Sequence, residues 1–256
     1  MKRVLTGLIL LPIFVYIVVW SPSPVFWAAV GIVAVLCFYE YAGLVERHNI
    51  AKPGIYGYVA GLLVLFIPRP DVLLLTLIAL LALALAMSLP DLAGALPFAG
   101  ALLLGVLYVF GCLRAGIGLR ALSPFWLLFA LSENWVGDVA AFYVGRSLGR
   151  HRLAPRVSPA KSWEGAVAST IMSLVYAFFY FSYLLKSVPL PWALAIAAAG
   201  NIAGQIGDLC ESALKRGAGV KDSGAMLPGH GGWLDRIDSS LFALPVVYSL
   251  ATFIAH

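Results

Sequence analysis

The stretch from Ser212 to Asp238, SALKRGAGVKDSGAMLPGHGGWLDRID, lies between two long apolar runs and concentrates the charge of the chain. Over all 256 residues, only 11% are charged and 62% are hydrophobic. The same stretch also contains six glycines and one histidine. Basic groups, carboxylates and flexible backbone between two apolar segments indicate a site for a highly charged ligand, with phosphates and metal ions as the leading candidates.

The apolar runs on either side of this stretch recur along nearly the whole chain, whose mean hydropathy is +0.94. Runs of about 17 to 25 residues are long enough to cross the roughly 30 Å hydrocarbon core of a bilayer. They lack the alternation of a barrel strand, which favours helices. We therefore predict an all-α, polytopic integral membrane protein with one membrane domain over residues 1–256.

Hydropathy predicts about nine transmembrane helices, at residues 4–20, 25–45, 54–68, 71–89, 93–113, 121–144, 163–185, 189–214 and 236–255. The first run is interpreted as a retained span, because it is long for a signal peptide and no small-x-small cleavage site follows it. The three cysteines are widely separated in apolar segments, so neither a disulfide framework nor a zinc site is expected.

The distribution of basic residues predicts the orientation of these spans. With the N-terminus inside, 13 of the 17 Lys and Arg residues fall in inside segments, as the positive-inside rule requires. The net charge of +5 is then mostly a property of the cytoplasmic face. We expect a multi-pass protein of the inner (cytoplasmic) membrane with its site facing the cytoplasm. Anionic lipid headgroups and cytosolic phosphates are expected partners, and nucleic acid is not.

Polar residues form a stripe on the predicted helix 189–214. Asn201, Gln205, Asp208, Ser212 and Lys215 are spaced four, three, four and three residues apart, so they share one helical face, with Glu211 at its edge. For Asn201 and Gln205, hydrogen bonding between transmembrane helices is an equally good interpretation. A carboxylate as deep as Asp208 needs a cation, which favours a functional role.

The next helix begins with a second acidic cluster. Asp235, Asp238 and Ser239 have i, i+3, i+4 spacing and share one face, although capping is an alternative role for Asp238. Two carboxylate-bearing helices that flank a basic, glycine-rich loop indicate a site for a hard cation with oxygen ligands. Mg²⁺ is the natural candidate, because it combines one or two carboxylates with substrate phosphates, and two cations can be held in this way.

The loop between these helices supplies groups that bind phosphate. Lys215, Arg216 and Lys221 can neutralise polyphosphate, and the glycines allow backbone N–H groups to approach it. His230 lies between two glycines, and a phosphate contact and an exposed bystander are equally good interpretations of it.

A second basic loop follows the predicted span 121–144. Asp138 precedes it, with Glu133 and Asn134 nearby, and Glu164 follows it inside apolar sequence. The basic residues alone fit the positive-inside rule, which does not explain the two flanking carboxylates. Ser158 and Pro159 fit the cap and first position of the next helix.

Two segments carry a resemblance to a known family. Residues 212–238 fit the pattern S-x-L-K-R-x4-K-D-x-G-x2-L-P-x-H-G-G-x2-D-R-I-D, which resembles the signature of the phosphatidate cytidylyltransferases, or CDP-diacylglycerol synthases. Residues 138–165, DVAAFYVGRSLGRHRLAPRVSPAKSWEG, are similar to a second block of that family. Val139 and Phe142 depart from it, standing where a hydroxyl residue and a tyrosine are expected.

The resemblance implies that CTP and phosphatidic acid react to CDP-diacylglycerol and pyrophosphate, with Mg²⁺ required, in phospholipid biosynthesis. It implies an all-helical homodimer with a cavity open to the cytoplasm. Residues 1–120 would be N-terminal spans and residues 121–256 the catalytic half.

The site residues that follow from the resemblance and the spacing fall into four groups. The catalytic residues are Asp208, Lys215 and Asp235, and the metal ligands are Asp208 and Asp235, joined by Asp238. The groups that bind substrate phosphate are Arg216, Lys221, His230, Arg236, Arg146 and Lys161. Supporting roles are expected for Asp138, Glu164, Ser212 and Asp222.

Two alternatives remain open at this point. A related cytidylyltransferase acting on another lipid phosphate would carry the same nucleotide-side motif. A membrane transporter would also need intramembrane carboxylates, but it would more often have matching interrupted helices in two halves. Here the polar groups are concentrated in the C-terminal half.

Overall fold

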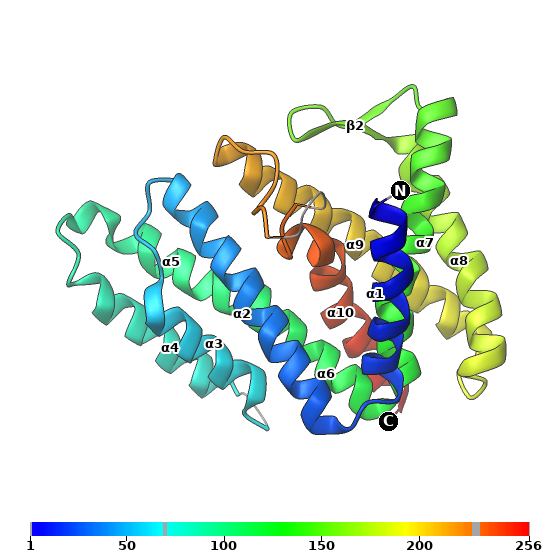
Figure 1. Cartoon of the computed structure of the whole chain (residues 1–256), viewed down its shortest axis with the longest axis horizontal. Coiled ribbons are helices and arrows are strands. Elements are labelled where there is room, and N and C mark those ends of the chain that lie inside the picture. The colour runs from blue at the N-terminus through cyan, green and yellow to red at the C-terminus, as the bar shows by residue number, and fades with distance from the viewer. Residues whose placement is uncertain (1, 69–70, 227–230, 256) are drawn as a thin grey trace. The chain divides into compact units, whose positions relative to one another are not determined.

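The computed structural model describes residues 2–68, 71–226 and 231–255, and almost all of the regular structure there is helical (Figure 1). In chain order the elements are α1 (Lys2–Val19), α2 (Ser23–Arg47), α3 (Gly54–Phe66), α4 (Val72–Ala86), η1 (Leu92–Gly94), α5 (Ala95–Gly105), η2 (Val106–Gly111), α6 (Cys112–Leu122), α7 (Pro124–Leu148), β1 (Arg152–Ala154), β2 (Ser158–Ser162), α8 (Trp163–Leu184), α9 (Leu190–Gly217) and α10 (Leu234–Ala255).

Five helical segments in the described ranges are long and apolar enough to span a membrane. They are α2, the continuous segment Leu92–Leu122, α8, α9 and the segment Leu234–Ile254 of α10. The helices α3 and α4 are apolar but shorter. The all-α membrane fold is therefore confirmed, whereas the predicted count of about nine spans is not.

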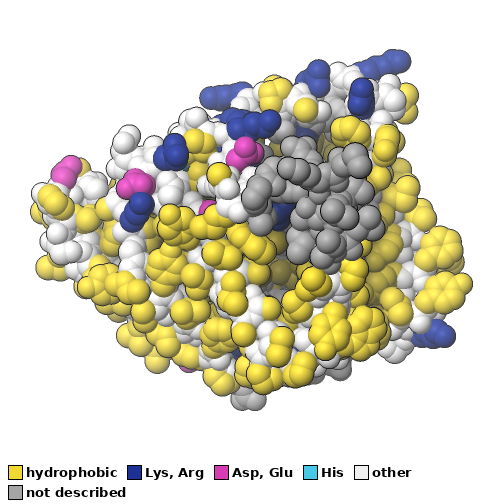
Figure 2. All heavy atoms as spheres, viewed as in Figure 1, with side chains coloured by type: hydrophobic (Ala, Val, Ile, Leu, Met, Phe, Trp, Pro, Cys, Tyr) yellow, Lys and Arg dark blue, Asp and Glu magenta, His cyan; other side chains and the backbone are white. Residues whose placement is uncertain are grey.

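Large hydrophobic side chains on the outer faces of the helices support membrane insertion. In the most apolar window of α8 only 28% of the residues are buried, so most of its apolar side chains face outward. Hydrophobic side chains cover much of the lower part of the face shown in Figure 2, and several Lys and Arg side chains lie near the β1–β2 end of that view. Such extensive apolar exposure suits contact with lipid.

The chain divides into two compact units whose segments alternate along the sequence. Unit 1 contains Met1–Phe26, Ala115–Ala213 and Ile237–His256, and unit 2 contains Trp27–Arg114 and Leu214–Arg236.

Unit 1 is built around the packing of α7 against α8, with α1 also against α7. Phe129 of α7 packs edge-on against Phe181 of α8, with ring centroids 4.7 Å apart. Gly200 and Gly204 of α9 leave room for α7, since a methyl group at either would overlap the side chain of Glu133 or Asn134. Small residues at the interface thus let polar side chains lie between closely spaced helices.

Unit 2 has an apolar core formed by α3, α4, α5 and η2. Ala60, Val64, Phe98, Leu102 and Val106 are all buried in it. Phe38 of α2 packs against Phe110, with ring centroids 5.2 Å apart. Phe38 lies two residues before the buried Glu40, near the end of α2 that is predicted to face the cytoplasm.

The start of α8 differs from the prediction. Ser158 and Pro159 were expected to cap and begin this helix, but they lie in β2, which pairs antiparallel with β1. The cap is Ser162, whose Oγ accepts a hydrogen bond from the backbone N–H of Gly165. A proline suits either role, because a short two-stranded ribbon leaves some N–H positions without a ladder partner.

Candidate functional site

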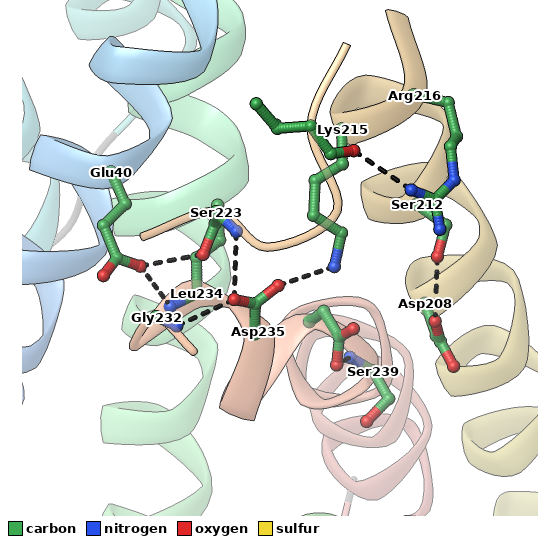
Figure 3. A network of polar contacts seen from close by, with 12 residues as sticks. Glu40, Asp208, Ser212, Lys215, Arg216, Ser223, Gly232, Leu234, Asp235 and Ser239 are labelled. Atoms are coloured by element: carbon green, nitrogen blue, oxygen red, sulfur yellow. Dashed lines mark hydrogen bonds and ion pairs between the residues drawn. The ribbon is translucent and has the colours of Figure 1, made fainter. Parts of the chain in front are cut away.

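Asp235 is the centre of the polar cluster in unit 2 and lies in the first turn of α10. Its Oδ1 accepts a hydrogen bond from Lys215 Nζ at 2.6 Å (Figure 3). Its Oδ2 accepts from the backbone N–H groups of Ser223, at 3.0 Å, and Gly232, at 2.8 Å. The side chains of Lys215 and Asp235 are only 10% and 7% exposed, so this is a buried ion pair.

The backbone near Asp235 depends on glycine. Gly231 has φ of +77°, in the region that residues with a Cβ atom rarely adopt. A Cβ atom there would lie 2.8 Å from Asp235 Oδ2. Gly232 donates its N–H to the same oxygen. These N–H groups had been expected to approach phosphate, yet the N–H of Gly232 binds a carboxylate of the protein itself.

Glu40 of α2 is a member of this cluster that the sequence reasoning missed. It is only 3% exposed, and its Oε2 accepts hydrogen bonds from Ser223 Oγ and Leu234 N, each at 2.9 Å. The sequence did contain a signal for Glu40, because it is a carboxylate within the predicted span 25–45, and an ionisable residue in a membrane helix indicates a functional site by default.

The other described residues of this loop with predicted phosphate-binding roles, Arg216, Lys221 and Arg236, are exposed. An Arg216 guanidinium N–H donates to the backbone carbonyl of Val220 at 3.1 Å. Asp222, for which a supporting role was expected, is exposed as well. Exposed cations are accessible to a soluble polyphosphate. His230 lies outside the described residues.

Asp208 is the centre of the second cluster, in unit 1. Its Oδ2 is paired with Lys161 Nζ of β2, and its Oδ1 accepts from Ser212 Oγ at 3.3 Å. The side chains of Lys161 and Asp208 are 29% and 31% exposed, so this pair is more accessible than the one in unit 2. Asp138 of α7 interacts electrostatically with both members of the pair. The structure thus brings together residues from both predicted basic-loop segments.

Asn201 and Gln205 lie on the same helix as Asp208 and bind the neighbouring helix α8, as well as each other. Asn201 Nδ2 donates to Ser169 Oγ at 3.1 Å, and Thr170 Oγ1 donates to Asn201 Oδ1 at 3.1 Å. Gln205 Nε2 donates to the carbonyl of Ala166 at 3.2 Å and to Asn201 Oδ1 at 2.7 Å. These contacts favour the interpretation as hydrogen bonds between transmembrane helices.

Glu164 and Arg146 lie at the ends of helices beside the β1–β2 hairpin. Glu164, in the first turn of α8, accepts a hydrogen bond from His151 Nδ1 at 2.6 Å and is close to the His151 backbone N–H. It therefore ties the start of the hairpin to α8. Arg146 is exposed in the last turn of α7, where a cation complements the helix dipole.

Asp238 lies where α10 packs closely against Gly207 of α9 within unit 1. A Cβ atom at Gly207 would be 2.8 Å from the Asp238 carbonyl oxygen and 2.9 Å from Phe242 Cβ. The Asp238 carboxylate accepts from the N–H of Ser239 at 2.7 Å, a local contact within the first turns of α10. Because α10 begins at Leu234, Asp238 lies inside the helix and not at its cap, so this contact does not support the capping alternative, and the predicted metal role of Asp238 stays a prediction.

The predicted metal ligands can be compared with what a cation needs. Among the described residues, no group of three or more His, Cys, Asp or Glu side chains is placed to hold a metal ion. Asp208 and Asp235 are each paired with a lysine, so each position already binds a positive charge. The carboxylate of Asp208 or Asp235 is a suitable ligand for Mg²⁺, which binds one or two carboxylates and fills its remaining octahedral positions with water and phosphate oxygens.

Comparison with known proteins places these clusters in a family context. Residues 1–254 match the profile of the cytidylyltransferase family. The chain is similar to the phosphatidate cytidylyltransferase of Bacillus subtilis, with 33% identity over 97% of this chain and 96% of that protein. It is also similar to the enzyme of that name from Staphylococcus haemolyticus, with 31% identity over 96% of each chain. The one from Thermotoga maritima is 44% identical over 47% of each chain.

Proposed function

Because this chain belongs to the cytidylyltransferase family, we propose that it transfers the cytidylyl group of CTP to phosphatidic acid and forms CDP-diacylglycerol and pyrophosphate. The observation that carries this proposal is the buried Lys215–Asp235 pair, which two backbone N–H groups of the signature segment hold in place. A cation and a carboxylate fixed in this way are suited to handling phosphate charge.

The reaction joins two anions. A phosphate oxygen of phosphatidic acid attacks the α-phosphorus of CTP, the new P–O bond forms, and the bond to the bridging oxygen of pyrophosphate breaks. No general base is required, since the phosphate monoester is largely ionised near neutral pH. The protein therefore has to screen the repulsion, align the reactants and stabilise charge on the leaving group.

Basic residues of both clusters perform this screening in our proposal. Lys215 and Lys161 bind phosphate oxygens of the substrates, and each is held by a carboxylate that orients its ammonium group. Arg216, Lys221 and Arg236 are exposed and are proposed to bind the triphosphate as it arrives from the cytosol. His230 and Arg146 are proposed to add further phosphate contacts, and Asp138, Glu164, Ser212 and Asp222 to support these groups.

Mg²⁺ is the cation that we propose at Asp208 and Asp235, with Asp238 as an additional ligand, and the proposal extends to a second cation. When bound, it would neutralise phosphate charge and stabilise the leaving pyrophosphate. The support for this assignment is the donor chemistry: carboxylate oxygens are the ligands that Mg²⁺ prefers, and both residues already bind a cation.

The remaining expectations concern the membrane. We propose a multi-pass protein of the inner membrane with about nine spans and with both clusters facing the cytoplasm, where CTP is available, while phosphatidic acid enters laterally from the bilayer. The positive-inside distribution of Lys and Arg supports this orientation. A homodimer is proposed on the family resemblance alone.

Purified protein incubated with labelled CTP and a panel of lipid phosphates, with and without Mg²⁺, tests the proposed reaction. We expect labelled product with phosphatidic acid, dependent on Mg²⁺. Product with a polyprenyl phosphate but not with phosphatidic acid would assign the chain to another lipid acceptor. The absence of labelled product with every lipid tested would contradict the enzymatic proposal and favour the transporter alternative.

A further inference from the structure

Glu40 lies outside both segments that resemble the family, yet it contacts the loop that carries the signature. It projects from α2 and is almost completely buried in unit 2. Its Oε2 accepts from the hydroxyl of Ser223 and from the backbone N–H of Leu234, each at 2.9 Å (Figure 3). One carboxylate oxygen thus binds two loop positions that are separated by eleven residues in sequence.

The backbone of the loop lies against the Glu40 side chain. A methyl group at Gly224 or at Gly232 would overlap the Glu40 carboxyl group. Glycine at both positions therefore permits a close approach that any other residue would prevent. Within three consecutive residues, Gly232 comes close to the Glu40 carboxylate and Leu234 donates its N–H to the same carboxylate.

Ser223 connects Glu40 with Asp235. Its hydroxyl donates to Glu40, and its backbone N–H donates to Asp235 Oδ2. The N–H of Gly232 reaches the same oxygen, two residues before the N–H that donates to Glu40. Asp235 Oδ2 therefore has two backbone donors close to Glu40. One belongs to Ser223, whose hydroxyl binds Glu40, and the other belongs to Gly232, two residues before Leu234, whose N–H binds Glu40. Asp235 Oδ1 remains directed at Lys215.

Because Glu40 is buried, it cannot act as an ordinary charged residue at the protein surface. A buried carboxylate is costly unless hydrogen bonds compensate it. Here the hydrogen bonds to Oε2 come from the signature loop, whereas the buried Oε1 has no hydrogen-bond partner among the described residues. In contrast, Glu46 of the same helix is 61% exposed and pairs with Lys52 at 2.8 Å. One helix thus provides both a buried loop-binding carboxylate and an exposed one.

We propose that Glu40 is a positioning residue for cytidylyl transfer, which holds Ser223 and Leu234 so that their neighbours fix Asp235 against Lys215. The inference rests on the proposed function of the site. Glu40 itself does not touch substrate; it acts through the loop. Its removal should lower kcat more than it raises KM for CTP, because a misplaced Asp235 weakens interactions made in the transition state.

The test compares E40A, E40Q and the control E46A in purified form. We expect E40A to lower kcat at least 30-fold, whereas E40Q, which keeps an acceptor oxygen, stays within about fivefold of wild type. E46A should behave like wild type, because its carboxylate is exposed. An E40A enzyme within twofold of wild type would overturn the proposal.

A double-mutant cycle with S223A separates positioning from general destabilisation. S223A should lower kcat several-fold in the wild-type background and have no further effect in E40A, because both remove the same hydrogen bond. If the kcat losses of S223A and E40A multiply in the double variant, the proposed link between Glu40 and Ser223 is overturned. If E40A does not accumulate, E40D replaces it in the cycle, since its carboxylate is one methylene group shorter and should also fail to reach Ser223.

Amide hydrogen exchange gives a readout that does not depend on turnover. E40A should accelerate exchange of the Ser223, Gly232 and Leu234 amides, whereas E46A should leave them unchanged. Inactive wild-type protein would contradict the proposed function, but the exchange result would still decide whether Glu40 holds the loop. Unchanged exchange in E40A would overturn the positioning role even if the wild type is active.

Discussion

The buried Lys215–Asp235 pair yields a stability prediction with a defined magnitude. Its side chains are 10% and 7% exposed, and Nζ and Oδ1 are 2.6 Å apart. Removing one partner of a buried ion pair typically costs about 3 to 5 kcal/mol, because the other charge loses its compensation. For a chain of this size, a loss of about 3 kcal/mol corresponds to a thermal midpoint roughly 6 to 12 °C lower.

We therefore expect D235N and K215M each to lower the unfolding midpoint by that amount, measured by circular dichroism in one detergent. The double variant should be destabilised by clearly less than the sum, because it leaves neither buried charge without its partner. The Lys161–Asp208 pair is the matched control. Its side chains are 29% and 31% exposed, so D208N should cost less than about 1 kcal/mol. Strictly additive losses, or equal losses at the two pairs, would refute the argument.

Three further predictions follow from the site and its packing. D208N should abolish formation of CDP-diacylglycerol while the protein still accumulates in membranes, and near-normal turnover would exclude Asp208 as a metal ligand. G207A should destabilise the protein by about 1 to 3 kcal/mol, because its methyl group would meet α10 at 2.8 Å; in G43A, where the space is open, thermal unfolding should show no loss. G231A and G219A both place a side chain at positive φ, but only the former would crowd the carboxylate of Asp235. G231A should therefore lower kcat at least tenfold more than G219A, and equal rates would contradict this.

Much of the helical fold was predictable because hydropathy is a local property. Each predicted span lies on a helical segment of the structure, from α1 to α10. The start of α8 was wrong, because Ser158 and Pro159 fit both a helix cap and a short strand. The choice between them depended on pairing of Ala154 with Ser158, which is not encoded in either residue alone.

The site was predictable to the extent that its residues are close in sequence or share a helix. The signature segment contains both Lys215 and Asp235, and the helical spacing grouped Asp208 with Ser212, which hydrogen-bond in the structure. Glu40 was missed because it lies 183 residues from Ser223, and periodicity does not report contacts at that separation. The lysine partner of Asp208 likewise comes from a strand 47 residues away.

The most direct test of the central claim is the fate of individual phosphates of CTP. Purified protein is incubated with phosphatidic acid and Mg²⁺ in two parallel reactions, one with CTP labelled in the α-phosphate and one with CTP labelled in the γ-phosphate. Cytidylyl transfer predicts that the α-label enters the lipid and that the γ-label is released as pyrophosphate. Entry of the γ-label into lipid, or retention of both labels in CTP, would contradict the proposed function.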